Sequence, residues 1–477
     1  MNAALIGIPL LAALMAALLP SDRVRPWLLP VTALIHFALT LKAVFYPAQT
    51  AFSHWLVLDP VARPVLLLIS LLFLVISFYT VAYLRYRRER PNRVFCACLL
   101  SCLGTMTLVT WSNHLGVMWV AIETTALSTA PLIYFNHNPR SIEATWKYLL
   151  IGSVGIALAL LGSFFLAYSS LHSGMEPTLL LNELLRDAPT LSKPWLHAAF
   201  VLMLVGYGTK MGLAPMHTWK PDAYGAAPGA VGALLAGGVT SCAFLCILRI
   251  YHVCQASGDG PYIAPILLFM GLLSMVVAGI FMVGQHDYKR MLAYSSVEHM
   301  GILIFGLGLG APALFGTFLH LINNGLTKGL LFLSAANIHR SYDSTTTTVV
   351  RGALRRVPWS ATLFLIGFFA ITGSPPFGPF ISEFSILNAG FISGHFFSSA
   401  LFLLFLLVIF IGMGATVLTV VQGRVPDDAP TTPYREGIAT IAPPLILMLL
   451  VLILGLCIPS PLSNLLHDAA RFLEVTP

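Results

Sequence analysis

The chain has 477 residues, of which 57% are hydrophobic and only 9% are charged. Soluble domains carry about 25% charged residues, so this composition excludes a soluble protein. The net charge of +7 does not indicate nucleic-acid binding, because the basic residues gather in alternate loops, as in multi-pass membrane proteins. The apolar segments have helix length and lack the alternation of barrel strands. We therefore predict an all-α integral membrane protein embedded in a lipid bilayer.

Taken in chain order, the apolar segments predict about 14 transmembrane helices, because each is close to the roughly 20 residues that cross a bilayer. Glycines, prolines and charged residues separate the segments. The predicted spans are 3–19, 27–46, 62–84, 94–111, 114–135, 147–169, 196–220, 229–252, 263–284, 291–309, 312–337, 360–390, 397–421 and 439–458.

The distribution of basic residues predicts the orientation of the spans. The first segment lacks the positive region of a signal peptide and is followed by Arg23 and Arg25, which favours a first span with its N-terminus outside. Most of the 26 Lys and Arg residues then fall in cytoplasmic loops. The same assignment places Lys220 in a cytoplasmic loop and Arg249 on the opposite side. It predicts an even number of spans, with both termini outside.

Two of the predicted spans contain helix-breaking prolines beside an ionisable residue. The seventh span is interrupted at Pro215, next to Lys210, and the twelfth at Pro375 and Pro376, ahead of Glu383. Broken helices at corresponding positions are typical of transporters built from inverted repeats, and here they are five spans apart. The predicted divisions are N-terminal helices 1–3 (residues 1–93), a first five-helix repeat (94–252), a second inverted five-helix repeat (263–421), and a C-terminal loop and helix 14 (422–477).

Glu123 and Lys210 are charged residues deep within predicted spans. A charge at membrane depth costs a few kcal/mol or more, and such residues commonly lie on ion pathways. We predict that Glu123 and Lys210 form an ion pair whose separation would free the lysine to release its proton. The alternative is that Thr124 or Ser128 satisfies the Glu123 carboxyl group without any role in transport.

His320, Asn324 and Lys328 recur at four-residue spacing in the eleventh span. They therefore share one helix face, and their first and last members are about 12 Å apart. We predict that this face holds a row of waters that carries protons. The alternative is a polar contact between two helices.

Four further residues are candidates near the predicted path. Glu383 suits a terminal proton acceptor or donor on the outward side; the alternatives are a gate or a structural ion partner. Glu298 and His299 open the tenth span, and their alternative is a position near the cytoplasmic interface. His217 follows Pro215, where it would either lead protons in from the cytoplasm or cap the broken helix.

The sequence predicts no cofactor or metal on this chain. No loop is long enough for a nucleotide-binding domain, and no haem or iron–sulfur ligand spacing is present. The seven cysteines fall in or beside apolar spans, where we interpret them as small apolar residues without disulfides or metal. Any redox chemistry must then lie on another subunit, and whether this chain belongs to an enzyme stays open.

Four segments resemble the proton-pumping antiporter-like subunits of respiratory complex I, a family that includes the multisubunit cation/proton antiporters. They are residues 210–223, 233–237, 287–296 and 375–384. Residues 237–246 and 294–300 look most like hydrogenase-4 component F proteins, membrane subunits of nickel–iron hydrogenase complexes of the formate hydrogenlyase type.

The resemblance implies roles for individual residues. Glu123 and Lys210 match the family's glutamate–lysine pair, Lys328 its central lysine, Glu383 its terminal residue and His320 a relay histidine. The sequence departs from the family in two places. Ser241 stands where relatives often carry a bridging Lys or His, and Asn324 stands where some carry a second His.

The resemblance and the buried charges together predict a subunit that moves protons across a bacterial or archaeal cytoplasmic membrane. Its expected partners are other membrane subunits and a peripheral redox module on the cytoplasmic side. The predicted path runs from His217 to Lys210, through Ser241 to Lys328 and His320, and out near Glu383. The alternatives are a sodium/proton antiporter subunit, a subunit of an inorganic-carbon uptake complex, and a non-conducting scaffold.

Overall fold

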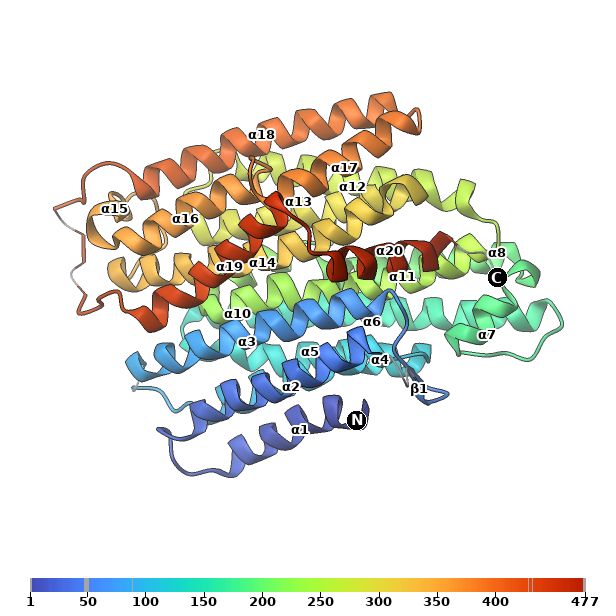
Figure 1. Ribbon diagram of the computed structural model, residues 1–477, viewed down its shortest axis with the longest axis horizontal. Helices are drawn as coiled ribbons and strands as arrows, with labels where there is room; N and C mark the ends of the chain where they lie inside the picture. The colour runs from blue at the N-terminus through green and yellow to red at the C-terminus, as the bar shows by residue number, and fades with distance from the viewer. Residues whose placement is uncertain (1, 47–50, 88, 428, 431, 475–477) are drawn as a thin grey trace.

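The computed structural model describes residues 2–46, 51–87, 89–427, 429–430 and 432–474. Its long helices lie side by side in one bundle, as Figure 1 shows. The α-helices are α1 (Asn2–Leu18), α2 (Leu28–Phe45), α3 (Ala62–Tyr86), α4 (Arg93–Trp111), α5 (Leu115–Ile133), α6 (Pro139–His172), α7 (Leu181–Arg186), α8 (Lys193–Met211), α9 (Trp219–Ala226), α10 (Gly229–Leu234), α11 (Thr240–Ala256), α12 (Gly260–Met282), α13 (Tyr288–Gly308), α14 (Ala311–Tyr342), α15 (Ala353–Arg356), α16 (Pro358–Ile371), α17 (Gly378–Ile392), α18 (Phe396–Val421), α19 (Ile438–Leu456) and α20 (Ser460–Glu474).

Four short helical turns and one hairpin complete the secondary structure of the described residues. The strands β1 (Ala51–Ser53) and β2 (Leu56–Val57) pair antiparallel. The turns are the 3₁₀ segments η1 (Arg25–Trp27), η2 (Tyr134–Asn136) and η3 (Ala188–Thr190), and the π-helical segment η4 (Leu235–Val239), which joins α10 to α11.

Ten of the described helical segments are long and apolar enough to cross a membrane. They confirm the predicted fold class of a multi-pass helical membrane protein. The helices α1 and α16 are apolar but shorter, and α8 and α14 carry polar residues in their interiors. The number of about 14 spans therefore stays a prediction.

Both predicted helix breaks are present. At the first break, α8 ends at Met211 because Gly212 has a φ of +83°. The amides of Gly212 and Leu213 then both donate to the Gly208 carbonyl and close the last turn of the helix. The chain resumes its helix at α9. The second break separates α16 from α17. The Ala214–Pro215 and Pro375–Pro376 peptide bonds are both cis.

Small residues bring α6 and α8 into close contact. A Cβ atom placed on Gly206 would lie 2.6 Å from the Gly155 carbonyl oxygen, so only glycine fits between the two backbones. Small residues at crossing points let membrane helices approach in this way. The contact fixes Lys210, at the end of α8, against the face of α6 that carries Tyr148 and Gly152.

The helix α14 forms the centre of the second half of the bundle. It packs against α13, α16, α17 and α19 and also contacts α3, α10 and α20. Its polar residues His320, Asn324 and Lys328 are all fully buried. The polar face predicted from their spacing is therefore enclosed by protein rather than lipid.

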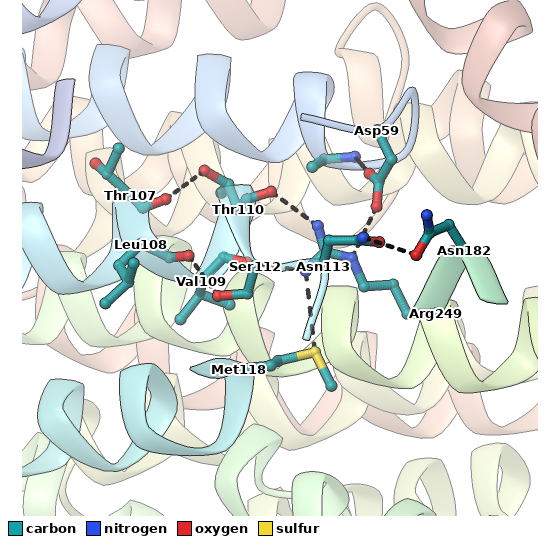
Figure 2. Close-up of polar contacts among 11 residues, drawn as sticks. Asp59, Thr107, Leu108, Val109, Thr110, Ser112, Asn113, Met118, Asn182 and Arg249 are labelled. Carbon is teal, nitrogen blue, oxygen red and sulfur yellow. Dashed lines mark hydrogen bonds and ion pairs between the residues drawn. The ribbon is translucent and has the colours of Figure 1, made fainter. Parts of the chain in front are cut away.

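Arg249 joins α11 to the end of α4 and to the loop before α3, near the end of the bundle where α11 ends (Figure 2). It was assigned to the outward end of the predicted span 229–252, but only 4% of its surface is exposed, and it lies within α11. Its guanidinium donates to the carbonyls of Val109 and Thr110 at 2.9 and 2.8 Å, and to Asp59 at 2.8 Å. The last carbonyls of a helix lack partners in a following turn, and Arg249 donates to two of those at the end of α4. It is a structural clamp that sidedness counting missed.

The helix α20 also escaped prediction. Its apolar residues Leu465, Leu466, Ala469, Ala470 and Leu473 are buried. Their spacing forms one stripe, and the helix packs with it against α14, α3 and α11. The segment is too polar to be read as a span.

We predict that Arg249→Met lowers the free energy of unfolding by about 3 kcal/mol, because it removes the buried cation paired with Asp59 and a donor to the Thr110 carbonyl. Thermal unfolding of the detergent-solubilised protein would measure this change. Arg186→Met removes an exposed pair with Asp187 and should change nothing measurable. Equal effects of the two substitutions would contradict the assignment of Arg249 as a clamp.

Candidate functional site

Lys210 lies fully enclosed at the end of α8, with 1% of its surface exposed. Its Nζ atom is 3.4 Å from the Tyr148 hydroxyl and 4.6 Å from the centre of that ring. Thr129 hydrogen-bonds the same hydroxyl at 2.7 Å. The lysine therefore rests on an aromatic ring, which attracts a cation, and beside a hydroxyl that is already held in place.

Glu123 does not form the predicted ion pair with Lys210. No carboxylate oxygen of Glu123 lies within 4.0 Å of the lysine nitrogen, although Glu123 is the carboxylate that acts electrostatically on Lys210. One of its oxygens is buried without a hydrogen-bond partner. The side chain that contacts the Lys210 amine is Tyr148 of α6, not Glu123 of α5.

Lys220 is the largest departure from the predicted layout. It was assigned to a cytoplasmic loop, but its exposure is 0%. It lies in the first turn of α9, directly after the break in α8. Its Nζ atom donates to the Met211 carbonyl at 2.8 Å and to the Ser296 carbonyl of α13 at 3.3 Å. The chain turns back into the bundle after Pro215 and so carries this lysine inward.

The other end of α9 is fixed by ion pairs. Asp222 is 2.8 Å from Lys147 of α6 and 3.0 Å from Arg290 of α13. These pairs lie at the end of the bundle where α3, α14 and α18 end, on the left of Figure 1. We call it the basic end, because Arg85, Arg340 and Arg424 lie in its last turns and loops.

Lys328 connects α14 to α13 through Ser295. Its Nζ atom donates to the Ser295 hydroxyl at 2.6 Å and makes a longer contact of 3.5 Å with the Leu292 carbonyl. Ser295 in turn donates to Glu298 at 3.5 Å. Glu298 is 2% exposed, so protein encloses it on all sides. A lysine, a hydroxyl and a carboxylate therefore follow one another inside the bundle.

Two histidines continue this series towards α17. Nε2 of His299 is 3.8 Å from Glu298, and Nδ1 of His299 is 3.1 Å from Nε2 of His320. Nδ1 of His320 is 3.1 Å from the Ser382 hydroxyl. His299, like His320, has 0% exposure. The structure therefore brings together His320 and His299, which sequence analysis could place only on separate helices.

Glu383 completes the cluster. One ligand atom from each of His299, His320 and Glu383 lies within 4.8 Å of the others. One Glu383 oxygen is buried without a partner, and the other would lie 2.2 Å from a Cβ atom on Gly373. Both ring nitrogens of His320 already have hydrogen-bond partners, which suits a proton relay better than a metal-ligand set. The break before α17 thus positions Glu383 beside the histidines.

Asn324 lies on the predicted face but has no partner. Its side-chain amide is fully buried and makes no hydrogen bond in the structure. Asn323, which sequence analysis did not single out, is equally unpaired and points at Gly378, where a Cβ atom would lie 2.2 Å from its oxygen. Buried amides normally have partners, so the side chains of Asn323 and Asn324 remain available to hydrogen-bond water or a neighbouring group.

Ser241 and His217 have no direct contact with the other residues of the predicted path. The Ser241 hydroxyl donates to the Gly237 carbonyl of its own helix at 2.6 Å, and it has no hydrogen bond to Lys210 or Lys328. His217 is 6% exposed, and its Nδ1 atom has no partner. Its ring lies 6.3 Å from Tyr294, at the break before α9. Neither predicted role is tested by these contacts.

Known proteins with similar sequences belong to one family of membrane subunits. Residues 112–412 match the family described as NADH:quinone oxidoreductase/Mrp antiporter, TM. A hydrogenase-4 component F homolog of Methylacidiphilum infernorum is 30% identical over 430 residues, covering 88% of this chain and 89% of its own. That relative agrees with the subgroup that the motifs indicate.

Two solved complexes contain chains of the same fold. One is the membrane-bound sulfane sulfur reductase, an archaeal respiratory membrane complex, with a TM-score of 0.87, 22% identity, and coverage of 99% of this chain and 97% of the other. The other is the Mrp complex of Dietzia sp., with a TM-score of 0.87, 19% identity and the same two coverages. From the family match and the relative in Methylacidiphilum, the chain belongs to the antiporter-like membrane subunits of the NADH:quinone oxidoreductase/Mrp antiporter family.

Proposed function

We propose that the chain moves protons across a cytoplasmic membrane as one subunit of a redox-driven complex. The observation that carries this proposal is the buried series Lys328, Ser295, Glu298, His299, His320 and Ser382, with Glu383 beside it. Its closest steps, Lys328 to Ser295, His299 to His320 and His320 to Ser382, have the 2.6–3.2 Å spacing at which protons transfer directly. Ionisable groups are costly in a bilayer, so a series of them favours an ion path over a scaffold.

Lys210 and Glu123 form the other half of the proposed path. A proton leaving the Lys210 ammonium converts it to a neutral amine, and the acceptor gains the charge. The Glu123 carboxylate favours the charged form of Lys210 when it is close and favours it less when it moves away. A partner subunit that displaces Glu123 would therefore prompt Lys210 to release its proton.

The two halves correspond to the proposed inverted repeats, residues 94–252 and 263–421. The break between α8 and α9 follows Lys210, and the break between α16 and α17 precedes Glu383. Each break thus places an ionisable side chain inside the bundle. Residues 1–93 and 422–477 would then flank the two repeats.

The proposed partners follow from the relatives and from the charge distribution. The relative in Methylacidiphilum is described as a hydrogenase component, and the sulfane sulfur reductase is a respiratory complex. A peripheral redox module would dock on the basic end, which we propose faces the cytoplasm, with both termini outside. This chain would hold no cofactor; its seven cysteines are free thiols, six of them buried or partly buried in helices.

The proposal is tested with the complex isolated together with its native subunits and placed in proteoliposomes. The nickel, iron–sulfur and flavin content of the complex identifies the electron donor to use, and a lumenal pH-sensitive dye follows protons. Replacing sodium by potassium separates the alternatives, because only a sodium/proton antiporter would change its flux. A zinc protein that copurifies in place of a redox module would favour inorganic-carbon uptake.

We predict that Lys210→Met lowers proton movement per assembled complex by about tenfold or more, because it removes a group that carries the proton. Glu123→Gln should also lower it, since it removes the charge that governs Lys210. The control Lys193→Met removes a partly exposed lysine that pairs with Asp259 at the end of the bundle opposite the basic end. Unchanged proton movement in both Lys210→Met and Glu123→Gln would leave the scaffold as the better function.

We also predict that Ser295→Ala slows proton movement by about tenfold, because it removes the hydroxyl between Lys328 and Glu298. Ser334→Ala is the matched control, since Ser334 is a fully buried hydroxyl of α14 without a hydrogen-bond partner. Both variants should assemble normally. If they move protons equally fast, the link through Ser295 is not part of the path.

A further inference from the structure

The two halves of the proposed path need a group between them that can hold a proton. Ser241 cannot serve, because a hydroxyl does not store a proton at neutral pH and its own hydrogen bond goes to Gly237. Lys220 lies in the gap between the halves. We propose that Lys220 is the proton carrier that joins Lys210 to Lys328, an inference that rests on the proposed function.

On the side of the first half, Lys220 reaches the end of α8. It donates to the carbonyl of Met211, the residue directly after Lys210. The neighbouring Trp219 donates from its indole to the carbonyl of Thr209, the residue directly before Lys210, at 2.9 Å. The first two residues of α9 thus donate hydrogen bonds to the carbonyls of the residues on either side of Lys210.

Aromatic rings line the space between the two amines. Trp219 contacts Tyr148 at 5.1 Å and Tyr224 at 6.1 Å between ring centres. The Lys210 amine lies over the Tyr148 ring and the Lys220 amine near the Tyr224 ring, at 4.6 and 5.7 Å. The two amines therefore lie against the two ends of one row of packed rings, Tyr148, Trp219 and Tyr224, which accommodates a positive charge on either amine.

On the side of the second half, Lys220 and Lys328 bind consecutive residues of α13. Lys220 donates to the carbonyl of Ser296, and Lys328 donates to the hydroxyl of Ser295. Lys328 also acts electrostatically on Lys220, and Lys220 on His299. The buried hydroxyls of Tyr224 and Ser296 interact with each other here. Hydroxyls beside an amine can pass a proton onward.

The environment of Lys220 suits a carrier more than a fixed counter-charge. Among the described residues, no carboxylate oxygen lies within 4.0 Å of its Nζ atom. Its two hydrogen bonds go to neutral carbonyls, which an ammonium and a neutral amine can both satisfy. Gly212 leaves room for the side chain, because a Cβ atom there would lie 2.6 Å from Cδ and 2.9 Å from Nζ of Lys220.

The proposed transfer conserves charge. An N–H bond of the Lys210 ammonium breaks, and its proton joins the lone pair of the neutral Lys220 amine, so the positive charge moves to Lys220. Lys220 then gives one proton to a neutral Lys328, by way of the hydroxyls of Tyr224, Ser296 and Ser295 or of intervening waters. Each lysine returns to its starting state when the next proton arrives.

Three variants of the intact complex test this inference in proteoliposomes, with the rate of proton movement per assembled complex as the readout. Lys220→Met removes the carrier and should lower the rate by about tenfold or more. Lys220→Arg keeps a cation and donors for Met211 and Ser296 but cannot release a proton, so it should assemble normally and be equally slow. Lys289→Met is the matched control, because Lys289 is a 4% exposed lysine that donates to two carbonyls, those of Gly225 and Ala227, at the basic end.

The outcomes separate this inference from the proposed function. A slow Lys220→Arg with a normal melting temperature, beside a fast Lys289→Met, supports Lys220 as the carrier. If Lys220→Arg moves protons at the wild-type rate while Lys210→Met does not, the inference fails and the proposed function stands. If Lys210→Met is also as fast as wild type, the proposed function fails as well. If Lys220→Met does not assemble, Lys220→Arg alone decides.

Discussion

A buried amine needs hydrogen-bond acceptors, and a helix that ends inside the membrane offers its last backbone carbonyls as acceptors. The first half of the structure depends on this pairing of a buried amine with a helix end. The last carbonyls of α8 carry the negative end of its dipole and lack the amides of a following helical turn. Lys220 and Trp219 donate to these carbonyls, and they can reach them only because the chain turns back at Gly212 and Pro215. The break and the buried lysine therefore stabilise one another, and each would be costly alone.

The same contacts organise the bundle around α13. Its Ser295 and Ser296 receive a lysine from each half, and its His299 passes the contact on to His320. At the basic end, Asp222 ties α9 to Lys147 and Arg290. The short helix α9 is thus anchored at both ends, by its lysine inside the bundle and by its aspartate near the loops. Arg249 plays a comparable part elsewhere, holding α11 against the end of α4.

The sequence predicts those features of the fold and of the site that depend only on residues close to one another along the chain. Composition and apolar runs were enough for the membrane fold. Pro215 and Pro375 marked both breaks because each follows a glycine, Gly212 or Gly373, with a positive φ; Pro131 and Pro265, by contrast, lie within continuous helices. Depth in a span also marked Lys210, Lys328 and Glu383.

Lys220 was misplaced because it follows a break, where distance along the chain no longer measures depth. The Glu123–Lys210 pair and the His299–His320 contact depend on how helices rotate about their axes, which no single span records. The apolar stripe of α20 was present in the sequence, but an amphipathic segment is invisible to a search for wholly apolar ones.

The two histidines have a consequence for timing. A neutral imidazole carries hydrogen on one nitrogen only, and His320 has a partner at each nitrogen, His299 on one side and Ser382 on the other. When a proton arrives at one nitrogen and departs from the other, the ring is left as the opposite tautomer. The row then points the wrong way for a second proton moving in the same direction. It must be reset, ring by ring, before it can conduct again. A buried imidazole pair of this kind passes one proton at a time, because both rings must return to their starting tautomers before the next proton can follow. It therefore cannot conduct continuously, as an open pore does.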